Sequence, residues 1–215
     1  MAIYKKEIYN KKKNERGYFM LVKRIKDKTE LENLKSFEVE NILWGTEQIP
    51  HTYGALGFVE GDGFYLKMVC EEEDPLRVYK EFGDPVYRDS AMEAFFMFQP
   101  DGGYFNFEMN ANGALLTEFG MGRTGRRKLD AEIGRLLECR AVIEKGQWCV
   151  YLHLPLCVLE KFYGPIEIKE GDSFGCNFYK ISETKETEHY ASCFPIDSET
   201  PNFHLPEFFG TATID

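Results

Sequence analysis

The segment YRDSAMEAFFMFQPDGGYFNFEMNANG, residues 87–113, contains the pattern that decides the fold class of this chain. Two runs rich in aromatic residues, at 93–98 and 104–109, flank the turn sequence PDGG at 100–103. Aromatic residues favour strands, whereas proline, aspartate and glycine favour tight turns. The segment therefore predicts two antiparallel strands joined as a hairpin.

In the second run, side chains alternate with the period of two that is typical of a strand. The residues of one face are Tyr104, Asn106, Glu108 and Asn110. The residues of the other face are Phe105, Phe107 and Met109. The first face could line a ligand groove, or it could be the solvent side of an ordinary antiparallel sheet.

Strand and turn signals continue on both sides of this segment. Further strands are expected at 55–59, 64–70, 114–118, 138–144, 148–154, 174–181 and 208–214. Short helical patterns occur at 29–35 and 156–162. This spacing predicts an all-β protein, an antiparallel β-sandwich of jelly-roll or immunoglobulin-like type with minor short helices. We expect one domain over residues 1–215, in which 1–35 form a basic N-terminal arm and a peripheral first strand.

The charge and composition of the chain restrict its partners and its location. Its 215 residues carry a formal net charge of −10, which argues against nucleic acid as a partner. The basic segment 1–28 could be a solvated extension or could touch an anionic surface. No apolar stretch approaches the ~20 residues that span a bilayer. No secretory signal is recognisable, so we expect a cytoplasmic protein, or a secreted one if a leader precedes this sequence. The six cysteines contain no CxxC pair and are expected to be reduced.

Two positions combine an aromatic ring with nearby polar groups. Tyr87 precedes the strand that carries Glu93, and an exposed ring can stack on a sugar while a carboxylate accepts hydrogen bonds from its hydroxyls. The alternative is a tyrosine that covers the edge of the core while Asp89 caps a loop. Phe203 lies between two prolines, which would hold it in a stiff corner at the rim. The alternative is a phenylalanine that plugs the end of the sandwich.

Other patterns suggest different chemistry. Glu93 and Glu108 on neighbouring strands are the natural candidates for glycoside hydrolysis, which needs two carboxyl groups about 5 to 9.5 Å apart. The loop GMGRTGRR at 120–127 could cradle an anion or be a flexible basic loop, and it lacks the Lys-Ser/Thr ending of a P-loop. The candidate hydrogen-bond donors toward a ligand are Arg88, Arg123 and Arg126.

In order and spacing, YRDSAMEAFF at 87–96, YFNFEMNANG at 104–113 and NFHLPEFFG at 202–210 resemble the motifs of family 9 carbohydrate-binding modules. These modules are DOMON-like β-sandwiches that are found attached to xylanases. They clamp a terminal sugar ring between two aromatic side chains, usually tryptophans. The clamp positions fall on Tyr87 and Phe203.

The resemblance also assigns polar positions. The sugar-binding Glu of the family falls on Glu93, and its amide-bearing neighbourhood falls around Asn202. The position of a sugar-binding Arg is occupied by Glu108, which replaces a donor with an acceptor. The position of a family Trp is occupied by Cys193.

These correspondences imply non-catalytic binding of carbohydrate, either a terminal sugar of a plant-type glycan or a small saccharide, in carbohydrate catabolism. Two alternatives stay open: a glycoside hydrolase of xylanase type, and a protein-interaction module that has lost sugar binding. The resemblance further implies structural calcium, for which the carboxylates at 71–74 or Asp101 are candidates. No other cofactor is expected, and neither the sugar nor the oligomeric state is indicated.

Overall fold

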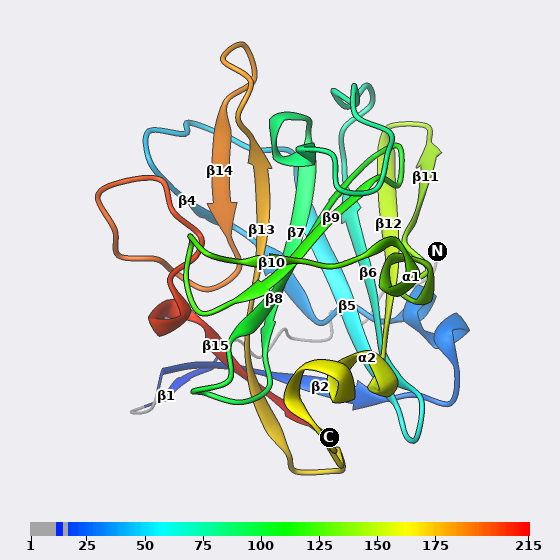
Figure 1. Cartoon of the computed structure of the whole chain (residues 1–215). Coiled ribbons are helices and arrows are strands. Elements are labelled where there is room, and N and C mark those ends of the chain that lie inside the picture. The colour runs from blue at the N-terminus through cyan, green and yellow to red at the C-terminus, as the bar shows by residue number, and fades with distance from the viewer. Residues whose placement is uncertain (1–11, 15–16) are drawn as a thin grey trace, which may run out of the picture.

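The hairpin expected within residues 93–109 forms, and it belongs to one of two β-sheets that pack face to face (Figure 1). The computed structural model describes residues 12–14 and 17–215. Strand β7 (Ala91–Met97) pairs antiparallel with β8 (Tyr104–Asn110). Gly103 has a φ of +83°, which a glycine adopts easily in the turn between them. The predicted β-sandwich is therefore confirmed at the segment that decided it.

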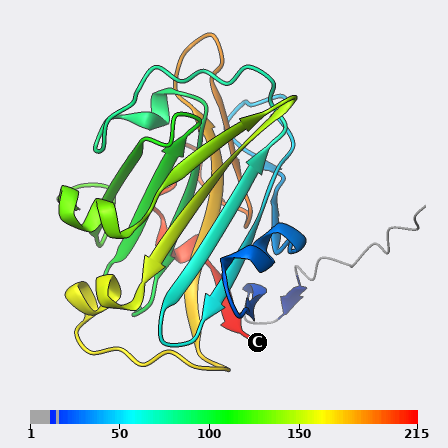
Figure 2. The same ribbon diagram turned by 90° about the vertical axis from the view of Figure 1, so that its right-hand side faces the viewer.

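The two sheets contain all the described strands. Sheet A contains β7 and β8 with β1 (Lys12–Asn14), β2 (Gly17–Arg24), β4 (Asn41–Ile42), β9 (Leu115–Gly120), β10 (Arg127–Lys128), β13 (Ser173–Ser182), β14 (His189–Ser192) and β15 (Gly210–Ile214). Sheet B contains β3 (Phe37–Val39), β5 (Thr52–Val59), β6 (Gly63–Cys70), β11 (Arg140–Glu144) and β12 (Gln147–Pro155). Sheet B faces the viewer in Figure 2.

Strand β2 joins the two sheets, and its position corrects two expectations. The strand order runs β10-β9-β8-β7-β13-β15-β2-β5-β6-β12-β11, so β2 is not peripheral but lies inside the path. It pairs in parallel with β15 on one side and with β5 on the other, so the sandwich is mostly, not wholly, antiparallel. Strands β2 and β15 come from opposite ends of the chain and are not joined by a turn. The pattern of residues therefore did not predict that they pair.

The core lies between the sheets and consists largely of aromatic side chains. The alternation in β8 is confirmed, because Phe105, Phe107 and Met109 point into this core. The rings of Phe37 and Phe178 stack there with centroids 3.7 Å apart. The opposite face of β8 is buried as well, under chain segments that cover the outside of sheet A. This covered outer face, rather than a solvent-exposed one, is where a site can form.

The helical segments are short. Helix α2 (Leu156–Tyr163) begins after Pro155 and ends at Gly164, and η1 (Lys28–Asn33) is a 3₁₀ helix, close to the two expected positions. The short turns η2 (Val86–Arg88) and η3 (Pro206–Phe208) and the helix α1 (Ala131–Leu136) were not expected. No described helix is long and apolar enough to cross a membrane.

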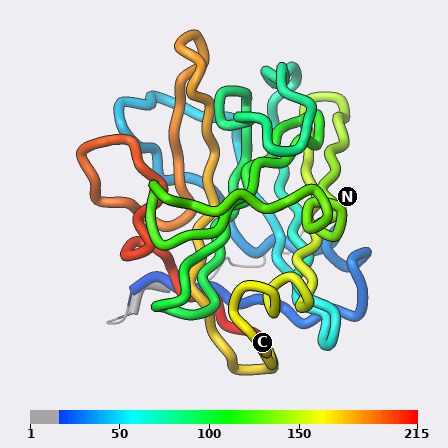
Figure 3. The backbone as a smooth tube through the Cα atoms, viewed as in Figure 1, coloured from blue at the N-terminus to red at the C-terminus, as the bar shows by residue number. Residues whose placement is uncertain are grey.

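The tube in Figure 3 shows the remaining connections, which are loops; some lie at the ends of the sandwich and others cover the outside of sheet A. The first part of the expected basic arm, residues 1–11, and residues 15–16 lie outside the described residues. All six cysteines lie within the described residues, and none forms a disulfide.

Candidate functional site

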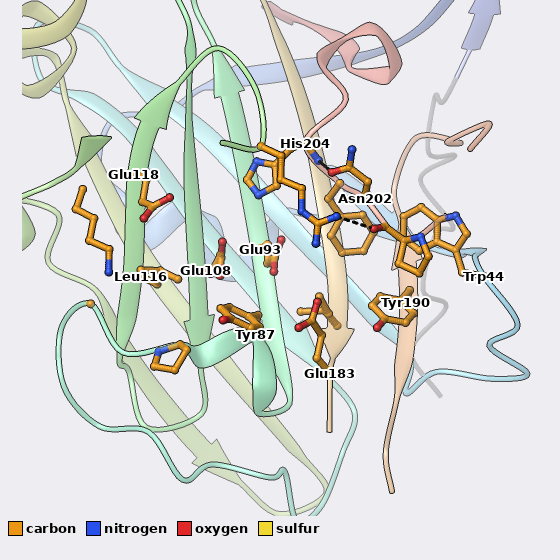
Figure 4. Close-up of a pocket in the computed structure, with 17 residues that line it drawn as sticks. Trp44, Tyr87, Glu93, Glu108, Leu116, Glu118, Glu183, Tyr190, Asn202 and His204 are labelled. Atoms are coloured by element: carbon orange, nitrogen blue, oxygen red, sulfur yellow. Dashed lines mark hydrogen bonds between the residues drawn. The ribbon is translucent and has the colours of Figure 1, made fainter. Parts of the chain in front are cut away.

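A cavity of about 530 Å³ lies over the outer face of sheet A (Figure 4). Its volume is in the range of small-ligand sites. Side chains from β7, β8, β9, β10, β13 and β14 line it together with residues from loops that are far apart in the sequence. The chemistry-bearing residues among them are Trp44, Tyr87, Glu93, Glu108, Glu118, Arg123, Lys128, Glu183, Tyr190, Asn202, Phe203 and His204. All five predicted ligand-binding residues therefore line one cavity: Tyr87, Glu93, Glu108, Asn202 and Phe203.

Glu93 and Glu108 lie at the base of the cavity. They are direct cross-strand partners on β7 and β8, and their side chains are 2% and 5% exposed. Burial raises the pKa of Glu108 to about 8. Burial also raises the pKa of Glu93 well above its ordinary value, and the neighbouring charges of Glu108 and Glu183 raise it further. Two carboxyl groups this close in a buried place disfavour being charged together.

Arg126 holds the loop between β9 and β10 against sheet A through hydrogen bonds. Its guanidinium donates to Asn106 Oδ1 at 2.8 Å and to the carbonyl oxygens of Gly122 and Tyr104, both at 2.9 Å. It also lies 4.3 Å from the centroid of the Tyr104 ring. The loop at 120–127 is therefore held against the sheet by its own arginine. Arg126 is a structural donor here rather than a residue that lines the cavity.

Tyr87 is half-buried and lines the cavity from η2. The turn that carries it is held by Asp89, whose carboxylate accepts from the backbone N–H groups of Val78 and Tyr79 and from Asn110 Nδ2 at 2.7–3.0 Å. The interpretation of Asp89 as a loop cap is confirmed. Tyr87 keeps part of its ring accessible, as a stacking residue requires.

Phe203 also lines the cavity, but it is not a rim residue. Its side chain is 6% exposed, and one ring face stacks on Tyr179 with centroids 4.1 Å apart. Trp44 contacts it as well, at 5.3 Å between centroids. The expectation of an exposed ring at a stiff corner is therefore wrong, because the segment folds down onto sheet A. Phe203 packs as part of a cluster of aromatic residues.

The sequence analysis missed the aromatic cavity residues Trp44 and Tyr190, as well as Glu118, Lys128, Glu183 and His204. Trp44 has a φ of +49°, a rare backbone conformation for a bulky residue, and its indole N–H donates to Ser198 O at 2.7 Å. Tyr190 meets the Trp44 ring edge-on, with centroids 5.5 Å apart. Such strain often marks a functional position. The only available signal was that Trp44 is one of two tryptophans and precedes a glycine.

The other predicted polar residues have different places. Asn202 lines the cavity, and its Oδ1 accepts from the backbone N–H of His204 at 3.0 Å. Arg123 lines it too, and its Nη1 donates to Pro201 O at 3.2 Å. Arg88 is exposed outside the cavity, with its guanidinium 5.9 Å from the centroid of the Tyr87 ring. Cys193 is buried in the core between the sheets.

Glu72 and Asp101, two of the residues proposed for calcium, do not lie together in a metal-binding group. Glu72 Oε2 accepts from Ser90 Oγ at 2.5 Å and from Trp148 Nε1 at 3.0 Å, so it faces inward instead of into a loop. Asp101 lies exposed in the hairpin turn. Among the described residues, no three or more His, Cys, Asp or Glu side chains gather where they could hold a metal ion.

Comparison with known proteins relates this chain to carbohydrate-binding proteins. The family model described as carbohydrate-binding family 9 matches residues 25–214. None of the curated proteins matches the chain. A solved Bacteroides uniformis protein, with carbohydrate binding as its candidate function, is similar with a TM-score of 0.81 and 21% identity, over 92% of this chain and 99% of that one.

Two structures of a family 9 carbohydrate-binding module from Caldicellulosiruptor kristjanssonii are also similar. The complex with glucose has a TM-score of 0.65 and 13% identity, over 92% of this chain and 95% of that one. The complex with cellotriose has a TM-score of 0.61 and 12% identity, over 91% of this chain and 93% of that one. At these identities, the likeness shows a shared fold.

Proposed function

This chain belongs to carbohydrate-binding family 9, and on that premise we propose that it binds the terminal ring of a saccharide, without catalysis, in the cavity over sheet A. The observation that carries the proposal is the arrangement of aromatic rings across this cavity. Tyr87 lies on one side of Glu183, and Tyr190 with Trp44 lies on the other (Figure 4). The clamp would thus use Tyr87 against the Trp44–Tyr190 cluster, with Phe203 as the support behind that cluster.

This arrangement suits a sugar ring. Aromatic faces bind the C–H surfaces of a sugar, and polar groups at the base bind its hydroxyls. The carboxyl groups of Glu93 and Glu108 and the amide of Asn202 supply acceptors and donors within the same cavity. A carboxyl group that keeps its proton can also donate to a hydroxyl oxygen, which a carboxylate cannot do.

The placement of the two glutamates favours binding over hydrolysis. A glycosidase needs its two carboxyl groups on either side of the scissile bond. Direct cross-strand partners project side by side from one face of a sheet, with Cβ atoms about 4.5–5.5 Å apart. Glu93 and Glu108 would therefore approach the same side of a ligand. An interaction module that has lost sugar binding would have no need of an open cavity with this lining.

Titration calorimetry with glucose, cellotriose and xylose tests the proposal. The first two are the ligands of the similar Caldicellulosiruptor kristjanssonii complexes, and xylose covers glycans degraded by xylanases. Because a single ring offers few contacts, we expect a Kd of roughly 10 µM to 1 mM for the best sugar. If none of these sugars binds detectably, the result would favour the interaction-module alternative.

A substitution at Tyr87 tests where the sugar binds. Tyr87→Ala removes one side of the clamp and should weaken binding by about 1–2 kcal/mol, roughly ten-fold. Tyr87→Phe keeps the ring and should retain most of the affinity. Tyr53→Ala is the matched control, because Tyr53 is also half-buried but lies on β5 in sheet B. Equal losses in Tyr87→Ala and Tyr53→Ala would contradict the assignment of the site.

A further inference from the structure

Acidic side chains outnumber basic ones in the lining of the cavity. Four glutamates line it: Glu93, Glu108, Glu118 and Glu183. Only Arg123 and Lys128 among its lining residues are cationic side chains, and Arg123 already donates to a backbone carbonyl. An uncharged sugar can use these carboxyl groups as hydrogen-bond partners, but it cannot use their negative charge. A ligand that brings a positive charge would balance it.

A second observation points to the base of the cavity. Glu108 Oε1 accepts from Asn106 Nδ2 at 2.8 Å, but Glu108 Oε2 is buried with no hydrogen-bond partner among the described residues. A buried acceptor without a donor costs about 1–3 kcal/mol. Arg126, whose charge acts on Glu108, uses its N–H groups on Asn106 and on backbone carbonyls. An N–H group of a ligand would therefore satisfy this oxygen once the carboxyl group has given up its proton.

The chemistry of two adjacent carboxyl groups selects among possible cations. A divalent metal would need more ligands than this pair, and the described residues offer no group of three or more metal-binding side chains. An ammonium group has three N–H donors and one charge, so it can donate to both carboxyl groups at once. A hydroxyl has a single donor and no charge. Charge-assisted hydrogen bonds of this kind are about twice as strong as neutral ones.

We propose that the preferred ligand of this cavity is an amino sugar whose protonated amine lies between Glu93 and Glu108. This inference rests on the proposed function, since the sugar ring would still occupy the aromatic clamp. The amine would take the place where a neutral sugar presents a hydroxyl. Glu183 and Glu118 would add longer-range attraction for the same charge.

The affinity for such a ligand should depend on pH. Burial raises the pKa of both glutamates, so near neutral pH the pair holds a proton that an incoming ammonium must displace. Binding should therefore strengthen as the pH rises toward 8 and weaken once the amine itself loses its proton. The other charged groups that act on the pair are Glu118, Arg126, Lys180 and Glu183.

Titration calorimetry at pH 7 tests this inference with four ligands. They are glucose, 2-amino-2-deoxyglucose, 6-amino-6-deoxyglucose and N-acetylglucosamine, which carries nitrogen without charge. We expect at least one amine to bind about ten-fold tighter than glucose, as one additional charge-assisted contact allows, and N-acetylglucosamine to show no such gain. Glucose binding at least as tightly as both amines would overturn the inference and leave the proposed function intact. If none of the four binds but cellotriose or xylose does, the inference is overturned and the proposed function stands, whereas no binding by any of these sugars would overturn both.

Two variants test whether the amine of the ligand binds beside Glu108. Glu108→Gln keeps the shape of the side chain but cannot carry a negative charge, so the advantage of the amine over glucose should fall to near one. Glu144→Gln makes the same formal change on the exposed end of β11 and should preserve the advantage. An advantage that persists in Glu108→Gln would refute the assigned position. A rise in Tm on adding calcium chloride that Glu108→Gln abolishes would identify the pair as a metal site and would also refute it.

Discussion

Lys180 Nζ lies 2.8 Å from His189 Nε2 in the interior of the protein, and both side chains are buried. The same ammonium donates to Ser90 Oγ at 2.7 Å, and that hydroxyl donates to Glu72 Oε2 at 2.5 Å. Trp148 Nε1 on β12 donates to the same carboxylate oxygen. A buried polar network therefore connects β13 of sheet A with β12 of sheet B.

This network makes Lys180 important for stability. Lys180→Met would leave Glu72 as a largely buried charge without its cation, and His189 without its donor. Removing one partner from a buried charged network typically costs about 3–5 kcal/mol. Urea unfolding should show a loss of this size relative to the parent protein. Lys161→Met on the surface of α2 is the control, and equal stability of both variants would mean that the network contributes nothing.

His189 should make stability sensitive to acid. Its Nδ1 lies 2.7 Å from the carbonyl oxygen of Thr187, so Nδ1 carries the proton and Nε2 accepts from Lys180. Burial, with the charge of Lys180, lowers the pKa of His189 to about 4, below its ordinary 6.5. The unfolded state then binds more protons between those two values, so stability should fall as the pH drops from 6.5 to 4.

Thermal unfolding at several pH values checks this prediction. His189→Gln can still accept from Lys180 but does not titrate, so its Tm should fall less than that of the parent protein over the same interval. Other groups titrate in both proteins, and the difference between the two curves isolates His189. Parallel curves from pH 7 to pH 4 would show that protonation of His189 is not a source of instability.

Much of the fold could be predicted because its strands are connected by local turns. The sequence PDGG and the alternation at Tyr104–Asn110 predicted both the hairpin and the residues on each face of β8. The parallel pairing of β2 with β15 could not be read in this way, because it joins residues almost 200 positions apart in the chain. The helix α1 was missed because it has six residues, one of which is Gly134.

Site residues within the sequence motifs could be predicted, whereas residues placed by long-range packing could not. Tyr87, Glu93 and Glu108 lie at the cavity because their strand and the preceding turn place them there. Phe203 was assigned to the rim because its flanking prolines indicated a stiff corner, but proline stiffness does not tell which way the corner faces. Trp44 reaches the cavity through one unusual backbone angle, which no periodicity reveals.

The burial of Phe203 leads to a prediction about stability. Phe203→Ala removes a ring that stacks on Tyr179 and contacts Trp44, so it should cost about 3–5 kcal/mol of unfolding free energy. Tyr87→Ala, at a half-buried position, should cost much less. Denaturant unfolding of the two variants gives the comparison. A Phe203→Ala variant as stable as Tyr87→Ala would restore the rim assignment.

Arg126 should control the order of the loop that borders the cavity. Arg126→Lys keeps a positive charge, but one ammonium cannot reproduce the guanidinium contacts with Asn106, Gly122 and Tyr104. We expect faster amide hydrogen exchange over residues 121–126 in this variant, by ten-fold or more. Arg127→Lys is the neighbouring control, because Arg127 is exposed. Unchanged exchange in Arg126→Lys would mean that the loop is ordered by other contacts.

Glu108 should lower the stability of the protein as the pH rises. Burial raises the pKa of Glu108 from its ordinary 4.5 to about 8, so the folded state binds more protons than the unfolded state between these values. Its contribution to stability is therefore present below pH 4.5 and is lost as the pH approaches 8. Glu108→Gln resembles the protonated acid at every pH. The variant should consequently gain Tm relative to the parent protein between pH 5 and pH 8, whereas the exposed Glu144→Gln should show a constant difference. A Glu108→Gln difference that stays flat across this range would mean that Glu108 is already ionised in the folded protein at pH 5, and the carboxyl pair would then be charged before any ligand arrives.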